Sequence, residues 1–156
     1  FTSAKGLAGG IPIGAMMCKK FCDVFQPGNH ASTFGGNPFV CATGLTVLKT
    51  IENDHILENV QARGEQLRSR LRSIAEVYPQ LFCDVRGWGL INGMEIRFEA
   101  SLTSADIVNA ALVEGLLMAP AGPKVLRFVP PLIVSEAEVD SAMDKLETAI
   151  SKLVHA

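Results

Sequence analysis

The chain has 156 residues, 48% of them hydrophobic, and its 14 basic and 16 acidic side chains give a net charge of -2. This composition is sufficient for a buried core and excludes a disordered chain. It shows no basic cluster of the kind that binds nucleic acid, and no apolar run of the roughly 20 residues that span a bilayer. We therefore expect a cytoplasmic protein whose partners are small molecules or other proteins.

The N-terminal third is predicted to contain a strand, a loop and a helix. The apolar residues 11–17, after Gly10, have the pattern of a short buried strand. Residues 26–38, with the sequence QPGNHASTFGGNP, have the composition of a loop. Asn37 as N-cap and Pro38 at the first helical position predict a helix that ends near Asn53.

A second helix is predicted from a cap at Asp54 to the residue before Pro79. Its apolar stripe comprises Leu57, Val60, Leu67, Leu71 and Ile74. After Pro79, alternation broken by glycines predicts an antiparallel pair of strands around residues 87–93. A change from helical to strand periodicity at this point predicts the start of a new domain.

The last part of the chain is predicted to form a small α+β domain. A helix should run from Ser104 to a stop at Gly115. Two strands, 116–119 and 125–129, should follow. The final helix should begin with a capping box made by Ser135 and Glu138.

Three segments are therefore expected: residues 1–53 as part of one domain, residues 54–78 as a helical connector, and residues 79–156 as a small C-terminal domain. The sequence begins with Phe1, and no preceding element supports the glycine-rich loop near the N-terminus. On this basis we expect the chain to be the C-terminal portion of a longer protein.

The sequence contains four cysteines, at positions 18, 22, 41 and 83, which we expect to be reduced and mostly buried because their neighbours are apolar. Cys18, Cys22 and His30 could be imagined as zinc ligands. A structural zinc site usually has four ligands, and no second pair of cysteines or histidines completes the set. We therefore expect no metal.

Lys5 is the first candidate for chemistry, since it precedes a run that contains Gly6, Gly9, Gly10 and Gly14. Desolvation in such a loop would lower the pKa of the lysine, as an amine that forms a Schiff base requires. Glycine-rich loops with a lysine also bind phosphates, and most lysines are simply solvated. The residues alone leave these three interpretations open.

Two further candidates lie in polar or mixed stretches. Ser32 and Thr33 could hydrogen-bond an anion, although serine, threonine and glycine also form ordinary turns. Arg127 stands between two apolar residues and before two prolines, Pro130 and Pro131. It could clamp a carboxylate, or it could face solvent from an edge strand.

Four motifs in this order, SAKGLAGGIPIGAM, STFGGNP, RGWGLINGMEI and LRFVPPL, resemble the class-III pyridoxal-phosphate-dependent aminotransferases, and among them most closely the acetylornithine aminotransferases. The resemblance extends over essentially the whole chain. It implies an α/β protein of fold-type I, with the C-terminal part of a large cofactor-binding domain followed by a small α+β domain. It also implies a homodimer with shared active sites.

The resemblance assigns roles to individual residues. Lys5 matches the lysine that binds pyridoxal phosphate covalently and then carries a proton between the substrate carbon and the cofactor. Thr33 matches a threonine that binds the cofactor phosphate in the other subunit's site, and Ser32 matches a neighbour that contacts substrate. Arg127 matches the arginine that holds the α-carboxylate of the substrate.

The implied reaction is transfer of the δ-amino group of N-acetylornithine to 2-oxoglutarate, which yields glutamate, in arginine biosynthesis. Ornithine, 4-aminobutyrate and succinylornithine remain alternative substrates, and a non-catalytic oligomerisation module is an alternative of another class. The family's upstream aspartate, stacking ring and phosphate loop do not match any part of this chain. We therefore expect the chain alone to be inactive.

Overall fold

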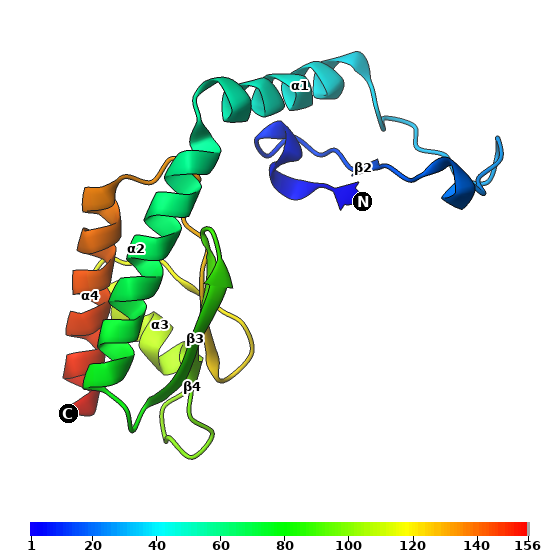
Figure 1. The fold of residues 1–156 in the computed structure, drawn as a ribbon. Coiled ribbons are helices and arrows are strands. Elements are labelled where there is room, and N and C mark those ends of the chain that lie inside the picture. The colour runs from blue at the N-terminus through cyan, green and yellow to red at the C-terminus, as the bar shows by residue number, and fades with distance from the viewer. Residues whose placement is uncertain (156) are drawn as a thin grey trace. The chain divides into compact units, whose positions relative to one another are not determined.

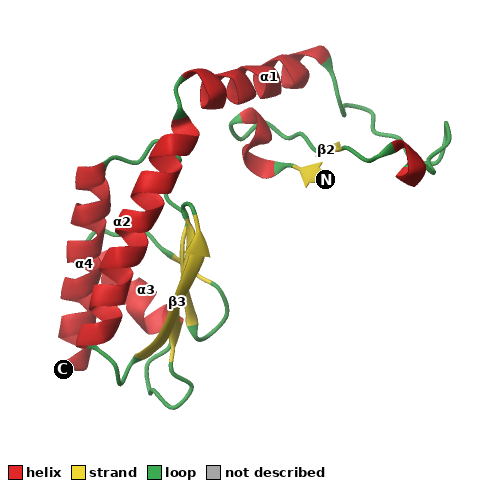
Figure 2. Cartoon of the chain, in the orientation of Figure 1, coloured by secondary structure: helices red, strands yellow, loops and turns green. Residues whose placement is uncertain are grey.

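The structure is a computed structural model that describes residues 1–155, and it divides into two compact units, Phe1–Ile56 and the residues from Leu57 onward. The first unit contains short strands and turns, long loops and one helix (Figures 1 and 2). The second contains an antiparallel sheet and three helices. Each unit is described by itself below.

In the first unit, β1 (Thr2–Ser3) pairs antiparallel with β2 (Ala15–Met16), and the 3-10 turn η1 (Lys5–Ala8) lies between them in sequence. A second 3-10 turn, η2 (Lys20–Cys22), follows. The strand predicted over residues 11–17 is therefore wrong except at its end. Pro12 has no N–H to donate, and β1, which pairs with β2 in the described part of the chain, is two residues long.

Helix α1 (Pro38–Asn53) confirms the predicted start signal. The Asn37 side-chain oxygen accepts hydrogen bonds from the N–H groups of Phe39 at 3.1 Å and Val40 at 3.2 Å. Pro38 occupies the first turn, where its missing N–H leaves no bond unmade. Asp54 was predicted to cap the next helix, but it is the C-cap of α1.

In the second unit, the strands β3 (Phe82–Trp88), β4 (Ile91–Ile96), β5 (Ala119–Pro120) and β6 (Val125–Phe128) form one antiparallel sheet in the order β3-β4-β6-β5. The helices α2 (Ile56–Val77), α3 (Ser104–Val113) and α4 (Glu136–Val154) lie on one side of it (Figure 1). The predicted strand pair and the last two helices are confirmed. The segment predicted as a connector supplies α2.

A single hydrophobic core fills the space between the helices and one face of the sheet. Alternate strand residues point into it, so that Met94, Ile96 and Leu126 are almost fully buried while Arg127 is exposed. The helices contribute the rest, chiefly Leu67, Leu71, Ile74, Ile107, Val139, Met143, Leu146 and Ile150. Helix α2 therefore belongs to the core of the second unit.

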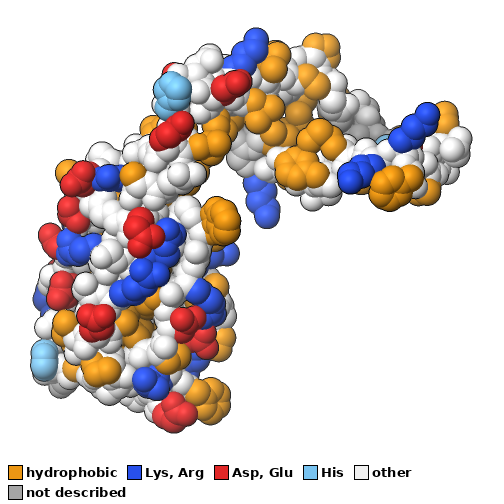
Figure 3. Space-filling view, in the orientation of Figure 1, with side chains coloured by type: hydrophobic (Ala, Val, Ile, Leu, Met, Phe, Trp, Pro, Cys, Tyr) orange, Lys and Arg blue, Asp and Glu red, His pale blue; other side chains and the backbone are white. Residues whose placement is uncertain are grey.

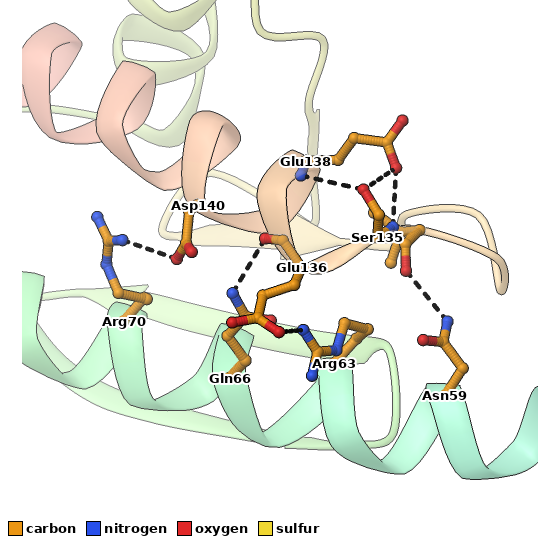
Figure 4. Close-up of polar contacts among 9 residues, drawn as sticks. Asn59, Arg63, Gln66, Arg70, Ser135, Glu136, Glu138 and Asp140 are labelled. Carbon is orange, nitrogen blue, oxygen red and sulfur yellow. Dashed lines mark hydrogen bonds and ion pairs between the residues drawn. The ribbon is translucent and has the colours of Figure 1, made fainter.

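Polar contacts join α2 to the start of α4 along the rim of this core (Figure 4). Arg63 forms an ion pair with Glu136 at 2.9 Å, and Arg70 forms one with Asp140 at 2.9 Å. The predicted capping box is present, since Ser135 and Glu138 bond to each other's backbone N–H groups. These contacts fix the register of the two helices.

The four cysteines are free, as expected, but all four are exposed, so the prediction of burial is wrong. Three of them lie in the first unit, whose apolar side chains are largely uncovered (Figure 3). Cys83 lies on the exposed face of β3. In the described part of the chain, no group of three potential ligands could hold a metal ion. Nor does any helix within residues 1–155 have the length and apolar character needed to cross a membrane.

Candidate active site

Lys5 is the first residue of η1 and has a backbone φ of 57°, in the left-handed region that non-glycine residues seldom adopt. Such a conformation costs on the order of 1–3 kcal/mol and persists only where the surrounding structure fixes it. The pairing of β1 with β2 holds the chain before Lys5. Gly9, with φ of 62°, ends the turn after it. The backbone therefore sets the direction of the lysine side chain.

The space in front of Lys5 is open. Its side chain is exposed, and with Thr2, Ser3 and Ala4 it lines a shallow depression of about 220 Å³. A Cβ placed on Gly6 would meet no atom within 4 Å. The glycine beside Lys5 therefore leaves room for a flat ligand.

Helix α1 supports the turn that carries Lys5. Gly44 of α1 is buried, and a Cβ placed there would lie 3.6 Å from the carbonyl oxygen of Leu7. Ala8, at the end of η1, is 1% exposed. A small residue in the helix thus allows the backbone of the turn to approach closely.

Ser32 and Thr33 lie in the loop before α1, and the structure gives them different environments. The Ser32 hydroxyl accepts a hydrogen bond from the N–H of Gly35 at 2.9 Å, which closes a local turn. A Cβ on Gly35 would lie 2.7 Å from that same hydroxyl oxygen, so the turn favours glycine. Thr33 is exposed, and its hydroxyl makes no hydrogen bond with residues 1–155. Thr33 is thus free to bind a ligand.

Arg127 lies in β6 between two strands, so it is not on an edge. Its neighbours across the sheet are Gly93 of β4 and Ala119 of β5. Both are small, and both lie on the sheet face that carries the Arg127 side chain. Within residues 1–155, Arg127 has no ion pair. The N–H groups of its guanidinium are therefore available to bind a carboxylate.

An apolar cavity of about 420 Å³ lies beside Arg127, within the second unit. Its walls include Leu117 and Met118 and the pair Pro130 and Pro131. A carboxylate held by Arg127 could therefore place an aliphatic chain against apolar surface.

A cluster of charges on the same sheet face as Arg127 was not predicted from the sequence. Arg86 of β3 forms ion pairs with Asp84 at 2.5 Å and with Glu95 of β4 at 2.5 Å. These carboxylates raise the pKa of the Arg86 guanidinium, mainly through the hydrogen bond with Asp84. The sequence holds one signal for this cluster. Asp84 and Arg86 are two residues apart, and residues at that spacing in a strand point to the same face.

The predicted site residues therefore fall into two groups. Lys5, Ser32 and Thr33 belong to the first unit, and Arg127 belongs to the second. No hydrogen bond joins Lys5 to Ser32 or Thr33 within residues 1–155.

Known proteins match this chain along most of its length. It is 73% identical over 154 residues to an acetylornithine aminotransferase from Synechocystis, covering 99% of this chain and 36% of that protein. It is 67% identical to the acetylornithine aminotransferase from Nostoc, covering 97% of this chain and 35% of that protein. The chain thus spans little more than a third of the length of these relatives.

Solved structures agree with this likeness. The N-acetylornithine aminotransferase from Stenotrophomonas maltophilia superposes with a TM-score of 0.83 at 33% identity, covering 99% of this chain and 40% of that one. The ornithine aminotransferase from Toxoplasma gondii gives a TM-score of 0.88 at 28% identity, covering 99% and 37%. The expected fold class, fold-type I, is confirmed. Residues 1–150 match the family described as Aminotransferase class-III, and the chain belongs to that family.

Proposed function

We propose that the protein is a pyridoxal-phosphate-dependent aminotransferase that moves the δ-amino group of N-acetylornithine to 2-oxoglutarate. The observation that carries the proposal is Lys5, whose strained backbone holds an exposed amine beside open space within a class-III aminotransferase chain. The names of the two relatives from Synechocystis and Nostoc reported above support N-acetylornithine as the amino donor.

The residues of the first unit are suited to the cofactor. The depression in front of Lys5 is open, and Gly6 presents no side chain to a flat ring. Lys5 would hold the cofactor through its amine, and the unpartnered Thr33 hydroxyl would bind the phosphate in the other subunit of a dimer. When bound, pyridoxal phosphate withdraws electrons from the substrate carbon that carries the amino group.

The residues of this chain then perform two tasks. Lys5 Nζ, once free of the cofactor, would take the proton from the carbon that carries the amino group, because an amine held next to that carbon can act as a general base. Arg127 binds the α-carboxylate of the substrate through two N–H groups of its guanidinium. The cavity beside Arg127 accepts the aliphatic chain of the substrate. Ser32 would contact the substrate.

The remaining assignments follow from the same proposal. The protein acts as a homodimer in the cytoplasm. Residues 1–53 complete the large domain. Residues 54–78 lead from it into the small domain, whose core includes their helix α2, and residues 79–156 supply the rest of the small domain. The chain alone is inactive, because it lacks matches to the family's other cofactor contacts.

Reductive trapping tests the proposal. In the full-length protein, borohydride reduction after addition of pyridoxal phosphate should attach the cofactor to Lys5, as mapped by peptide mass spectrometry. Lys5→Ala should abolish both the adduct and amino transfer. Lys20→Ala, which removes another exposed lysine of the first unit, should preserve both. A protein that gives no adduct at Lys5 would refute the cofactor assignment.

Two alternatives have specific support. The ornithine aminotransferase from Toxoplasma gondii is structurally similar, so ornithine is a second candidate donor, and parallel assays with both donors separate the two. The exposed phenylalanines of the first unit favour an assembly role without catalysis. Retention of biological activity by Lys5→Ala, with an intact dimer, would support that role.

A further inference from the structure

Arg86 and Arg127 share one row of the sheet. Arg86 of β3 is opposite Gly93 of β4, and Gly93 is opposite Arg127 of β6. Directly paired residues in antiparallel strands point to the same face. Two arginines therefore lie on the exposed face of the sheet, separated by a residue without a side chain.

Glu95 lies on the same face and within reach of both arginines. It is two residues after Gly93 in β4 and opposite Val125, so it is the diagonal neighbour of Arg127. Diagonal neighbours are about 7–8 Å apart, which long side chains can bridge. In the structure, Glu95 instead binds Arg86, together with Asp84.

Another carboxylate near Arg127 is also engaged. Glu138 lines the same cavity as Arg127, but its oxygen accepts hydrogen bonds from the backbone and side chain of Ser135. Within residues 1–155, Arg127 thus keeps an unpaired guanidinium, while Glu95 and Glu138 are both bound to other residues.

We propose that Arg86 is a positioning residue that holds Glu95 away from Arg127, so that the Arg127 guanidinium stays available to the carboxylate of the substrates. This inference rests on the proposed function of Arg127. Without Arg86, Glu95 turns to its diagonal neighbour and competes with the substrate. The competition raises the KM for acidic substrates and leaves kcat unchanged, because it acts on binding and not on the proton transfer at Lys5.

The expected rise in KM is small because the charged side chains are exposed to solvent. The side chains of Arg86 and Glu95 are 54% and 39% exposed, so their charges are screened by solvent. Because an exposed ion pair contributes at most about 1 kcal/mol, the competing pair should weaken substrate binding about fivefold.

The test uses five variants of the full-length protein, one of them Arg127→Gln as a control. It measures KM and kcat for 2-oxoglutarate and, by calorimetry, the affinity for glutarate. Arg86→Gln should raise KM about fivefold and weaken glutarate binding equally. Adding Glu95→Gln to that variant should restore both values to within about twofold, because no carboxylate is left to compete. Adding Asp84→Asn instead should not restore them, because Asp84 lies two strands and two residues from Arg127, about 12 Å away.

The two double variants, Arg86→Gln with Glu95→Gln and Arg86→Gln with Asp84→Asn, carry the same net charge. A difference between them therefore cannot come from the net charge of the protein. Equal rescue by Asp84→Asn would overturn the proposal in favour of a charge effect. Glu95→Gln alone should leave KM within about twofold of the unsubstituted value. A rise in KM for that variant would mean that the ion pairs merely shape the sheet, which would also overturn the proposal.

Failure of the proposed function would look different. If the unsubstituted protein shows no amino transfer, or if Arg127→Gln leaves glutarate binding intact, the role of Arg127 is wrong. If the unsubstituted protein transfers the amino group, Arg127→Gln loses glutarate binding and Arg86→Gln has no effect, only the role of Arg86 is wrong.

Discussion

Gly64 of α2 lies directly against Gly89 in the turn between β3 and β4. A Cβ placed on Gly64 would lie 2.6 Å from the carbonyl carbon and 3.0 Å from the Cα of Gly89. The turn itself is fixed, because Arg68 and the buried Asn92 each donate a hydrogen bond to the Gly89 carbonyl at 3.0 Å. Gly89 also has φ of 51°, which favours glycine.

Gly64→Ala should therefore destabilise the protein, although alanine normally improves a helix by about 1 kcal/mol over glycine. The clash is with backbone, which cannot rotate away, so we expect a net loss of about 1–3 kcal/mol in the free energy of unfolding. Urea denaturation measures it. Ser69→Ala, at an exposed position of the same helix, is the control and should have little effect. A stabilised Gly64→Ala variant would show that α2 and the turn are not packed this closely.

Local chemistry made some elements predictable. Asn37 with Pro38 and Ser135 with Glu138 specify helix starts through short-range hydrogen bonds, and both starts were predicted correctly. The strand over residues 11–17 failed because a strand depends on its partner, which periodicity does not reveal.

The candidate site residues Lys5, Thr33 and Arg127 were predicted because the motifs that contain them resemble those of a known family. The left-handed backbone of Lys5 and the packing of Gly44 against η1 depend on tertiary structure, and no local pattern encodes them. The contact of Arg86 with Glu95 depends on strand register, because a shift of one residue would place the two side chains on opposite faces.

The apolar stripe of α2 offers a direct test of which face is buried. Leu71 is 0% exposed in the core, whereas Leu57, predicted to lie in the same stripe, is 58% exposed. Leu71→Ala should reduce the free energy of unfolding by about 2–5 kcal/mol because it leaves a cavity. Leu57→Ala should change it by less than about 0.5 kcal/mol. Thermal or urea denaturation of both variants checks the pair, and equal losses would contradict the described core.

Acid should destabilise the second unit through its capping boxes. Hydrogen bonds from Ser135, first from its backbone N–H, lower the pKa of Glu138, and those from Thr103, first from its hydroxyl, lower the pKa of Asp106. A carboxyl whose pKa is lowered by folding contributes stability above its unfolded pKa, about 4 for these residues. That contribution is lost as the pH falls through the lower folded value.

Unfolding free energies measured between pH 7 and pH 2 should therefore decrease on the acid side. Ser135→Ala should make the decrease smaller but should not abolish it, because Glu138 loses the hydroxyl donor and keeps the backbone N–H of residue 135. Thr148→Ala, which removes a hydroxyl of α4 outside the capping box, should leave the acid dependence unchanged. An identical pH profile for Ser135→Ala and the unsubstituted protein would contradict the prediction.

Substitution of Arg127 should weaken substrate binding even when the charge is kept. Arg127→Lys retains the cation but loses the paired donors, so we expect the KM for 2-oxoglutarate to rise roughly tenfold to a hundredfold. Steady-state kinetics of the full-length protein measure the change. Arg72→Lys, at an exposed arginine of α2, is the control and should not change KM. An unchanged KM for Arg127→Lys would mean that the carboxylate binds elsewhere.

The first unit should make the isolated chain self-associate. Its exposed side chains include Phe21 at 81%, Phe34 at 82% and Phe39 at 68%, and apolar surface on this scale usually lies against another protein surface. Light scattering of residues 1–156 should show species larger than a monomer. Residues 57–156, which contain the continuous core, should remain monomeric in the same buffer. Because the attraction is apolar, Phe21→Ser combined with Phe34→Ser should reduce association, whereas added salt should not. A monodisperse monomer of the whole chain that melts cooperatively would contradict this prediction.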